Sequence, residues 1–429
     1  MNKIFLVIAF PILIFIIVFI PRSQAQSMDT VAPFKPGGNL WGLTFGDFLY
    51  KGNADTVGSS LGRGSNQYSK MPAGTRMFQF RRVYLGYNYD FSRKFSAEIL
   101  LAAENDYYEG SLGSQSSVGD VLYNNKFAPF IKLADVRWKN IFKGTDLVLG
   151  EMYTPAFPLL SEVVWGYRSI ERKVADMRGT PSYDEGASLQ GHFDDKANYG
   201  YNLMVGNGNG AVPENNNFAM FYGDVWAKFF DKRLIIDLYQ DYRKLNWNAV
   251  DTLTGGYHHD RNMTKVLIAW TVPKFTAGIE AFTATLMGDV IASTATSRTF
   301  YLTTKATAVS LYVRGRIYKD KLGFFARYDN YNPGHYINEI TDNPRIISYA
   351  AQTTSFDPAT KEQMVIVGVD YTPFPNIHLM PNFYMNTYQC TLPAADYSLS
   401  KYGSGVLGTD AVYRITIYFI FGKKDPVRF

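Results

Sequence analysis

The sequence predicts an all-β fold, a 16-stranded antiparallel transmembrane β-barrel with short periplasmic turns and long extracellular loops. Three observations lead to this prediction. Segments of about ten residues alternate between apolar and polar side chains, which is the pattern of barrel strands. The connections between the segments alternate between short and long. The aromatic content is high, with 31 Tyr and 31 Phe among 429 residues, and aromatic side chains favour strands.

The alternating segments give the positions of the predicted strands. They span residues 38–50, 77–91, 95–104, 129–140, 146–153, 185–193, 198–206, 217–230, 233–244, 262–272, 275–288, 303–318, 322–331, 361–372, 376–389 and 408–422. An up-and-down barrel requires an even number of strands, and this set provides sixteen.

The connections assign the two ends of the barrel. Short turns such as SRK (92–94), DDKA (194–197) and KDK (319–321) alternate with long connections rich in Gly, Asn, Ser, Asp and Pro. Outer-membrane barrels have short periplasmic turns and long external loops, whereas a soluble sandwich has no reason to alternate its loop lengths by side. Both ends of the barrel segment are therefore expected in the periplasm.

The two faces of the segments differ in polarity. The apolar face is expected to contact lipid, and it includes Trp41, Leu43, Phe45, Ile99, Leu101, Val225, Phe229, Leu311, Val367, Ile415, Ile417 and Phe419. The polar face includes Arg82, Arg137, Arg314, Arg316, Arg327, Arg414, Glu98 and Asp135. Unpaired charges packed inside a protein would cost several kcal/mol each, so we expect water to reach this face. A sheet that spans lipid must also close on itself, because its backbone groups have no other partners there.

Residues 1–25 are predicted to be a secretory signal peptide, and residues 26–429 the barrel domain. Ile4 to Ile20 are apolar throughout, and PRSQAQ follows with small residues suitably spaced for cleavage before Gln26. A membrane-anchoring helix is the alternative, because this run is at the lower limit of length for a span.

Charge and cysteine content exclude several classes of protein. Removal of residues 1–25 lowers the net charge only from +5 to +3, which is too small to indicate nucleic-acid binding. Cys390 is the only cysteine, so no intramolecular disulfide can form.

No compact Ser, His and acid arrangement can be found in the sequence, and YHHD (257–260) is better explained as a polar loop than as a metal site. We therefore expect no enzymatic activity, no metal and no cofactor.

Several stretches of the chain resemble one known family. They are RRVYLGYNYDFSRKFSAEI (81–99), LADVRWKNIFKGTDLVLGEMYTPAF (133–157), EGASLQGHFDDKANYGYNLMVGNGNG (185–210), GFFARYDNYNP (323–333) and MVIVGVDYTPFPNIHLMPNFY (364–384). These stretches are similar to strands of the phosphate-selective porin O and P family of bacterial outer-membrane porins. The resemblance implies a homotrimeric porin in the outer-membrane lipid, with a water-filled channel for passive diffusion of small hydrophilic solutes or ions, including anions such as phosphate. Glu151 stands where that family commonly has Gln, and the resemblance places it among the channel-lining residues.

The longest connection, residues 154–184, is the candidate constriction. In porins a loop near this position often folds into the lumen. Its basic residues would then form a positive rim, namely Arg168, Arg172, Lys173 and Arg178. The loop also contains acids, and Glu171 could pair with Arg168 at helical spacing. A salt-bridged structural loop is therefore an equal alternative to a selectivity rim.

The wall residues leave the ion preference open. Arg82, Arg137, Arg314, Arg316, Arg327 and Arg414 could line the path, but Glu98, Asp135 and other acids share their face. A mixed lumen favours a general channel over a strongly anion-selective one. The alternative function is an outer-membrane barrel scaffold, used for adhesion or assembly through external loops such as 51–76 and 332–360.

Overall fold

The computed structural model describes residues 34–55, 68, 71–104, 128–214, 217–244, 260–294, 299–334, 336–337, 346–351, 360–390 and 408–422. The chain divides into two units, Met1–Lys35 and Pro36–Phe429, and the second contains the barrel. The predicted signal peptide lies outside the described residues, as do His258 and His259 of YHHD.

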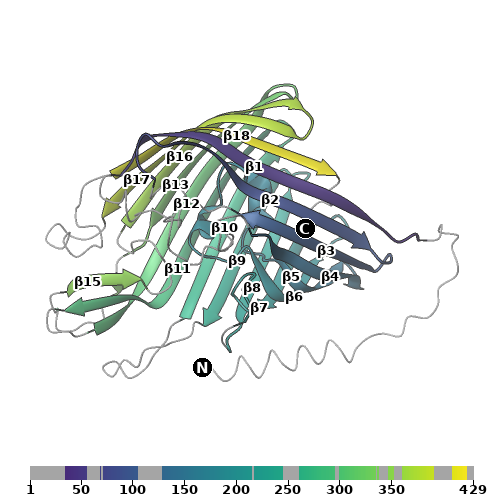
Figure 1. Ribbon diagram of the computed structural model, residues 1–429. Coiled ribbons are helices and arrows are strands. Elements are labelled where there is room, and N and C mark those ends of the chain that lie inside the picture. Colours follow the sequence, from purple (N-terminus) through teal and green to yellow (C-terminus); the bar gives the residue numbers. More distant parts are fainter. Residues whose placement is uncertain are drawn as a thin grey trace. The chain divides into compact units, whose positions relative to one another are not determined.

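The described strands of the second unit close into one antiparallel barrel (Figure 1). Its first eight strands are β1 (Gly37–Asn53), β2 (Arg76–Asp90), β3 (Phe95–Glu104), β4 (Phe130–Phe142), β5 (Thr145–Tyr153), β6 (Tyr183–His192), β7 (Tyr199–Gly206) and β8 (Met220–Phe229). The other eight are β9 (Leu234–Lys244), β10 (Asp260–Val272), β11 (Phe275–Thr294), β12 (Thr299–Tyr318), β13 (Leu322–Asn332), β16 (Thr360–Phe374), β17 (Ile377–Cys390) and β18 (Gly408–Gly422). β1 pairs with both β2 and β18, so these sixteen strands form a closed ring. The predicted 16-stranded fold is confirmed.

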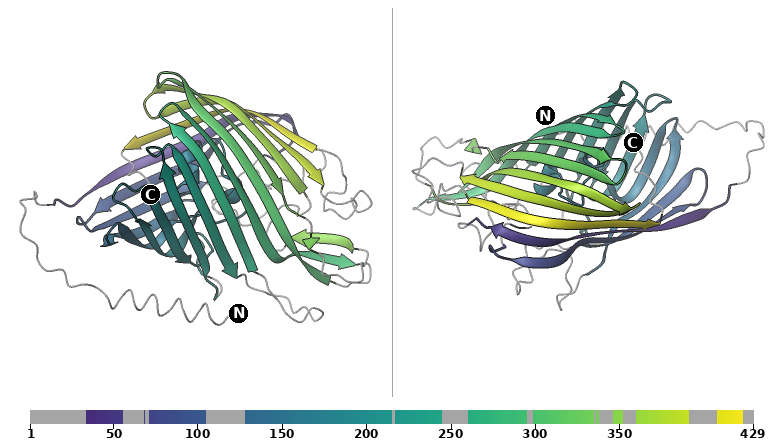
Figure 2. Two further views of the ribbon diagram at one scale, coloured as in Figure 1. Left: turned by 180° about the vertical axis from the view of Figure 1, so that it is seen from behind. Right: turned by 90° about the horizontal axis from the view of Figure 1, so that it is seen from above.

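Two further strands extend the wall at one place. β14 (Tyr336–Ile337) pairs with β12, and β15 (Ile346–Ala351) pairs with β11. Both lie in the predicted long loop 332–360. Figures 1 and 2 show the ends of β11 and β12 projecting beyond their neighbours, with β15 beside them.

The wall varies in height around the barrel. β11 and β12 have 20 residues each, whereas β5, β6 and β7 have 9, 10 and 8. The short strands flank the connection 154–182, which contains α2 (Ser161–Trp165) and α3 (Val174–Met177). Neither helix in the described residues is long or apolar enough to span a bilayer.

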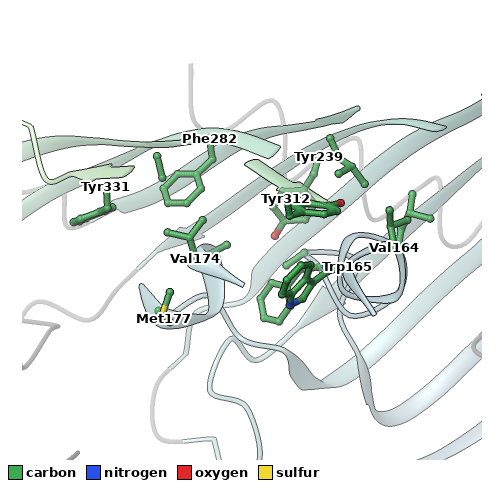
Figure 3. Close-up of a cluster of buried hydrophobic side chains, with 14 of the residues drawn as sticks. Val164, Trp165, Val174, Met177, Tyr239, Phe282, Tyr312 and Tyr331 are labelled. Carbon is green, nitrogen blue, oxygen red and sulfur yellow. The ribbon is translucent and has the colours of Figure 1, made fainter. Parts of the chain in front are cut away.

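The connection 154–182 is folded into the barrel and fills part of its interior. Trp165 is fully buried beside Tyr312 (Figure 3), with 5.3 Å between the two ring centroids. The Trp165 ring centroid also lies 6.4 Å from that of Phe325. Val174 and Met177 belong to the same cluster of buried side chains. The expectation that water would reach the whole polar face is therefore wrong for the part of the interior that the connection 154–182 occupies. That part is filled by buried apolar side chains and paired charges.

Most predicted lipid-facing residues lie on the outside, but β1 differs from its prediction. Ile99, Val225 and Ile415 are exposed on the outer face as expected. Trp41, Leu43 and Phe45 instead share the inner face with the buried Asp47 and Lys51. The Trp41 indole Nε1 donates a hydrogen bond to Asn88 Oδ1 at 2.6 Å. Apolar residues therefore cover part of the lumenal wall. The prediction that these three residues of β1 face lipid, which was based on their polarity alone, is wrong.

A β-bulge in β2 places two adjacent arginines inside. The register shifts between Phe45 and Gly46 of β1, which pair with Arg82 and Phe80, so Arg81 is the extra residue. Arg81 and Arg82 are 4% and 3% exposed, while Phe80 and Val83 on either side face outward. A bulge interrupts the period of two, so both guanidinium groups reach the interior.

Candidate functional site

Arginines of the wall hold the connection 154–182 by its backbone carbonyls. Arg327 Nη1 donates to Arg172 O at 2.7 Å, and Arg314 Nε donates to Val164 O at 3.1 Å. Arg81 donates to Ser169 O and, at 3.3 Å, to Ile170 O. Irregular buried backbone needs such donors, and guanidinium provides five in a rigid fork. The connection is therefore fastened to β2, β12 and β13.

Buried ion pairs add to these attachments. Lys173 Nζ lies 3.6 Å from Glu280 Oε1 of β11, and both side chains are fully buried. Lys265 of β10 lies 3.6 Å from the other oxygen of Glu280. Arg178 pairs with Glu362 of β16 at 2.8 Å. Burial lowers the pKa of the Lys173 ammonium to about 8, although Glu280 acts in the opposite direction.

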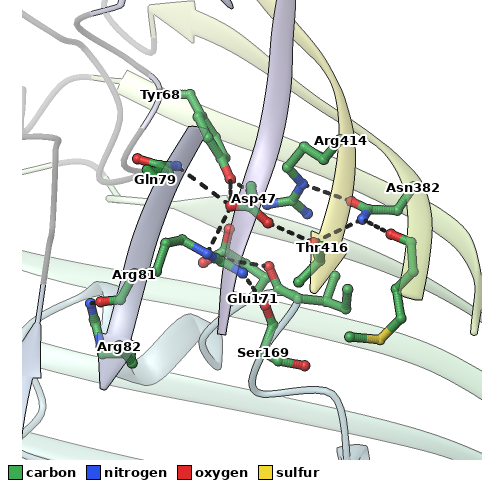
Figure 4. A network of polar contacts seen from close by, with 12 residues as sticks. Asp47, Tyr68, Gln79, Arg81, Arg82, Ser169, Glu171, Asn382, Arg414 and Thr416 are labelled. Atoms are coloured by element: carbon green, nitrogen blue, oxygen red, sulfur yellow. Dashed lines mark hydrogen bonds and ion pairs between the residues drawn. The ribbon is translucent and has the colours of Figure 1, made fainter. Parts of the chain in front are cut away.

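A second polar network surrounds Asp47 (Figure 4). Arg81 Nε lies 2.9 Å from Asp47 Oδ2, and the Thr416 hydroxyl donates to Asp47 Oδ1 at 2.6 Å. Tyr68, which follows β1, is fully buried there, and its hydroxyl accepts a hydrogen bond from Arg414 Nη1. This network joins β1, β2 and β18 and fixes Tyr68 inside the barrel.

The predicted rim residues are used mainly as attachments. Lys173 and Arg178 are buried in the ion pairs described above and do not form an open rim. Arg172 is partly exposed. Arg168 pairs with Glu162 at 3.1 Å and with Asp176 at 3.3 Å, instead of with Glu171 as the helical spacing indicated. The geometry favours the salt-bridged structural loop.

The predicted wall residues other than Arg314 and Arg316 fall into three groups. Arg82 pairs with Glu104 at 3.1 Å, and Arg137 pairs with Asp146 at 3.1 Å. Arg327 and Arg414 are buried and hydrogen-bonded, Arg327 to the connection 154–182 and Arg414 in the Asp47 network. Glu98 and Asp135 are opposite each other in the β3–β4 ladder on the inner face.

Glu151 was predicted to line the channel, and the structure places it on the outer face. It is opposite Glu185 in the β5–β6 ladder and opposite Ala134 in the β4–β5 ladder, and both of these residues are exposed. Directly opposed residues of an antiparallel pair lie on the same side of the sheet. Glu151 therefore shares the side of Leu149, while Met152 points into the core.

An open cavity of about 380 Å³ lies beside the connection 154–182. Tyr167 and Arg168 line it from the connection, and Arg314 and Arg316 of β12 line it from the wall. Within the described residues, Arg314 and Arg316 make no ion pair: Arg314 Nε contacts Val164 O, and Arg316 Nη1 contacts Asp320 O at 3.4 Å. A neighbouring cavity of about 550 Å³ shares both arginines with Arg233 and Lys274.

One acid of this cavity is already engaged. The Asp370 carboxylate accepts a hydrogen bond from the Tyr167 hydroxyl at 3.1 Å, and its other oxygen lies 2.8 Å from His378 Nδ1. Asp370 therefore links the connection 154–182 to β17 and is not paired with Arg314 or Arg316. The positive charge of these two arginines faces the cavity.

Comparisons with known proteins place this geometry in a structural class. The outer membrane channel DcaP of Acinetobacter baumannii superposes with a TM-score of 0.55 at 13% identity, covering 91% of this chain and 100% of that one. The barrel has the porin fold. OmpF of Salmonella typhi in complex with daunomycin gives 0.53 at 11% identity, covering 90% of this chain and 97% of that one. The anion-selective porin from Comamonas acidovorans gives 0.51 at 11% identity, with 90% and 100% covered.

No family model matches the sequence, and no curated protein matches it. The porin fold is therefore established by structure alone, and the specific resemblance to the phosphate-selective family stays a prediction. No group of three or more His, Cys, Asp or Glu side chains in the described ranges is placed to hold a metal ion.

Sequence reasoning missed several residues of the barrel interior. Arg81 was not selected, because the bulge that turns it inward has no signature in an alternating pattern. Lys132 was not selected either, although it lines the cavity and pairs with Glu104. Tyr68 lies in a predicted external loop, and nothing in its neighbourhood indicated that it would be buried. Of these three residues, only Arg81 could have been selected from the sequence, because it is adjacent to the selected Arg82.

Proposed function

We propose that the protein is an outer-membrane porin that forms a channel for passive diffusion of small hydrophilic solutes. The observation that carries this proposal is the cavity beside the connection 154–182, inside a closed barrel with the porin fold. A narrowed aqueous passage between a fixed internal loop and a charged wall is the arrangement that a diffusion channel requires. The proposal includes export to the outer membrane after cleavage of residues 1–25.

The proposal extends to a preference for anions. Most lumenal charges are neutralised by partners, as in the pairs Arg82 with Glu104 and Arg137 with Asp146. Arg314 and Arg316 are unpaired in the described part of the chain and face the cavity. The local field is therefore positive, which favours small anions such as phosphate.

We also propose a homotrimer. β5, β6 and β7 provide 9, 10 and 8 residues, close to or below the roughly 9–11 that a tilted strand needs to cross a bilayer. A second copy packed against this low part of the wall would shield it from lipid. Detergent-solubilised protein should therefore migrate at three times the monomer mass before heating and at monomer mass after it.

The alternative is a barrel scaffold without conductance. It is favoured by one observation, the apolar core that fills the interior around Trp165. Purified protein in a planar bilayer separates the two functions. A porin produces discrete conductance steps whose reversal potential in a salt gradient reports ion preference, whereas a membrane that stays closed at all voltages would remove the porin proposal. N-terminal sequencing of protein from the outer-membrane fraction should begin at Gln26.

A further inference from the structure

The cavity beside the connection 154–182 has two chemically different sides. On one side, Leu43 and Phe45 of β1 are opposite Tyr84 of β2 and Tyr418 of β18, respectively. All four line the cavity. Because these residues are direct neighbours in the ladders, they form one continuous strip of aliphatic and aromatic side chains across three strands, with Arg81 over the Phe45 ring and Lys132 over the Tyr84 ring. Its two β1 residues, Leu43 and Phe45, are ones that residue polarity alone had assigned to lipid.

The other side of the cavity is cationic. Arg314 and Arg316 are two residues apart on β12 and so point to the same face. Arg316 is opposite Gly323, and Gly323 is opposite Asp370. Asp370 accepts a hydrogen bond from Tyr167 and contacts His378, and in the described residues it forms no ion pair with either arginine. Gly323 carries no side chain, and a Cβ at this position would lie 2.9 Å from Gly315 O and 3.6 Å from the Tyr167 hydroxyl oxygen.

We propose that this cavity binds an organic anion with an apolar body, such as an aromatic carboxylate, with its head at Arg314 and Arg316 and its body on the strip of Leu43, Phe45, Tyr84 and Tyr418. This inference rests on the proposed channel function. A hydrated inorganic anion would use the arginines and gain nothing from the strip. A volume of about 380 Å³ lies within the range of roughly 300–1,000 Å³ that holds small ligands.

The test is block of single-channel current by three probes, benzoate, acetate and phosphate. Benzoate and acetate share a carboxylate, so their difference isolates the ring. Burial of a ring-sized apolar group increases affinity by about tenfold or more. We therefore expect benzoate to block at a concentration about tenfold lower than acetate, and at a lower concentration than phosphate.

Two variants locate the binding. Phe45→Ala should weaken block by benzoate several-fold and leave block by acetate unchanged, whereas Arg316→Gln should weaken both. Phe48→Ala is the matched control, because Phe48 is on the same strand but is exposed on the outer face. Benzoate should block the Phe48→Ala channel at the same concentration as the parent channel. If Phe45→Ala does not assemble, Leu43→Ala takes its place with the same expectation.

The outcomes distinguish this inference from the proposed function. Protein that gives no conductance would overturn the channel itself. Protein that conducts but is blocked equally by benzoate and acetate, or most strongly by phosphate, would overturn the binding of apolar anions and leave the channel intact. The same conclusion would follow if strip variants that assemble retained full block by benzoate.

Discussion

The Lys173 ammonium lies 3.6 Å from the Glu280 carboxylate, and neither side chain has exposed surface. One residue belongs to the connection inside the barrel and the other to β11 of the wall. Lys265 shares Glu280 and also lies 3.4 Å from Asp237. Two lysines thus alternate with two acids, and the charge balance inside the barrel depends on the internal connection staying in place.

Replacement of Lys173 by Met should loosen the connection 154–182. Glu280 and Asp237 would then share only Lys265, and breaking a buried pair from one side costs about 3–5 kcal/mol. We expect a lower melting temperature in detergent by circular dichroism and noisier open-channel current. The double variant Lys173→Met with Glu280→Met leaves Lys265 paired with Asp237, and it should recover most of the loss. Equal melting temperatures for the single and double variants would show that the stability of the barrel does not depend on pairing Glu280 with Lys173.

The Lys173 pair should also make stability depend on pH. The pKa of Lys173 is lowered by burial to about 8 in the folded protein, below the ordinary value of 10.5. Between these two values the unfolded chain binds more protons, so the free energy of unfolding should rise with pH across this window. Denaturant titrations at pH 7.5 and 10 should show this gain in the parent protein relative to Lys173→Met, where the lysine contribution is absent. A gain of equal size in both proteins would argue against titration at Lys173.

Arg327 should be irreplaceable by Lys. Its guanidinium donates to Arg172 O at 2.7 Å and pairs with Asp329 in a forked arrangement that a single ammonium cannot reproduce. We expect Arg327→Lys to keep the charge yet lower the free energy of unfolding by about 1–3 kcal/mol. Equilibrium denaturation of folded barrels measures this change. Stability equal to that of the parent protein would show that charge alone is sufficient.

Arg314 and Arg316 should set the ion preference. A unit charge about 6 Å from an ion in water contributes roughly 0.7 kcal/mol, or about threefold in permeability ratio. Arg316→Gln and Arg314→Gln should each reduce the anion to cation permeability ratio by about this factor, measured as the reversal potential in a salt gradient. Lys143→Gln is the control, since Lys143 is in a turn and its side chain is 86% exposed. A shift of the same size in the control would indicate a surface effect.

Glu151→Gln should stabilise the isolated barrel. Glu151 and Glu185 are opposite each other on the outer face, and like charges in this position destabilise a sheet by roughly 0.2–1 kcal/mol. We expect Glu151→Gln and Glu185→Gln each to raise the temperature at which the folded form is lost on gel electrophoresis. A lower temperature in both variants would instead indicate that a cationic partner group uses these carboxylates.

Strand positions were predictable because two solvents impose opposite demands on alternate residues. Ile99 and Val225 face outward, and Glu98 and Asp224 beside them face inward, as alternation requires. The rule failed at Trp41, Leu43 and Phe45, because a lumenal wall also tolerates apolar residues. It also failed at Arg81, where a bulge adds one residue.

The site was less predictable than the fold. Arg314 and Arg316 were selected as channel-lining candidates, and the structure places both at the open cavity. Lys173 and Arg178 were selected for the same reason, their charge, yet they are buried against Glu280 and Glu362. Charge in a sequence indicates that a partner or water is needed, and it does not indicate which of the two is present.

The sequence by itself determined the sixteen barrel strands, their order and which connections are short or long, because these depend on local alternation and on connection length. Only the tertiary structure decided which charges remain open to the lumen. That outcome depends on where the connection 154–182 packs, and its packing uses partners such as Glu280, Arg327 and Tyr312 that are more than a hundred residues away in the chain. Long-range pairing of this kind leaves no periodic pattern in the sequence.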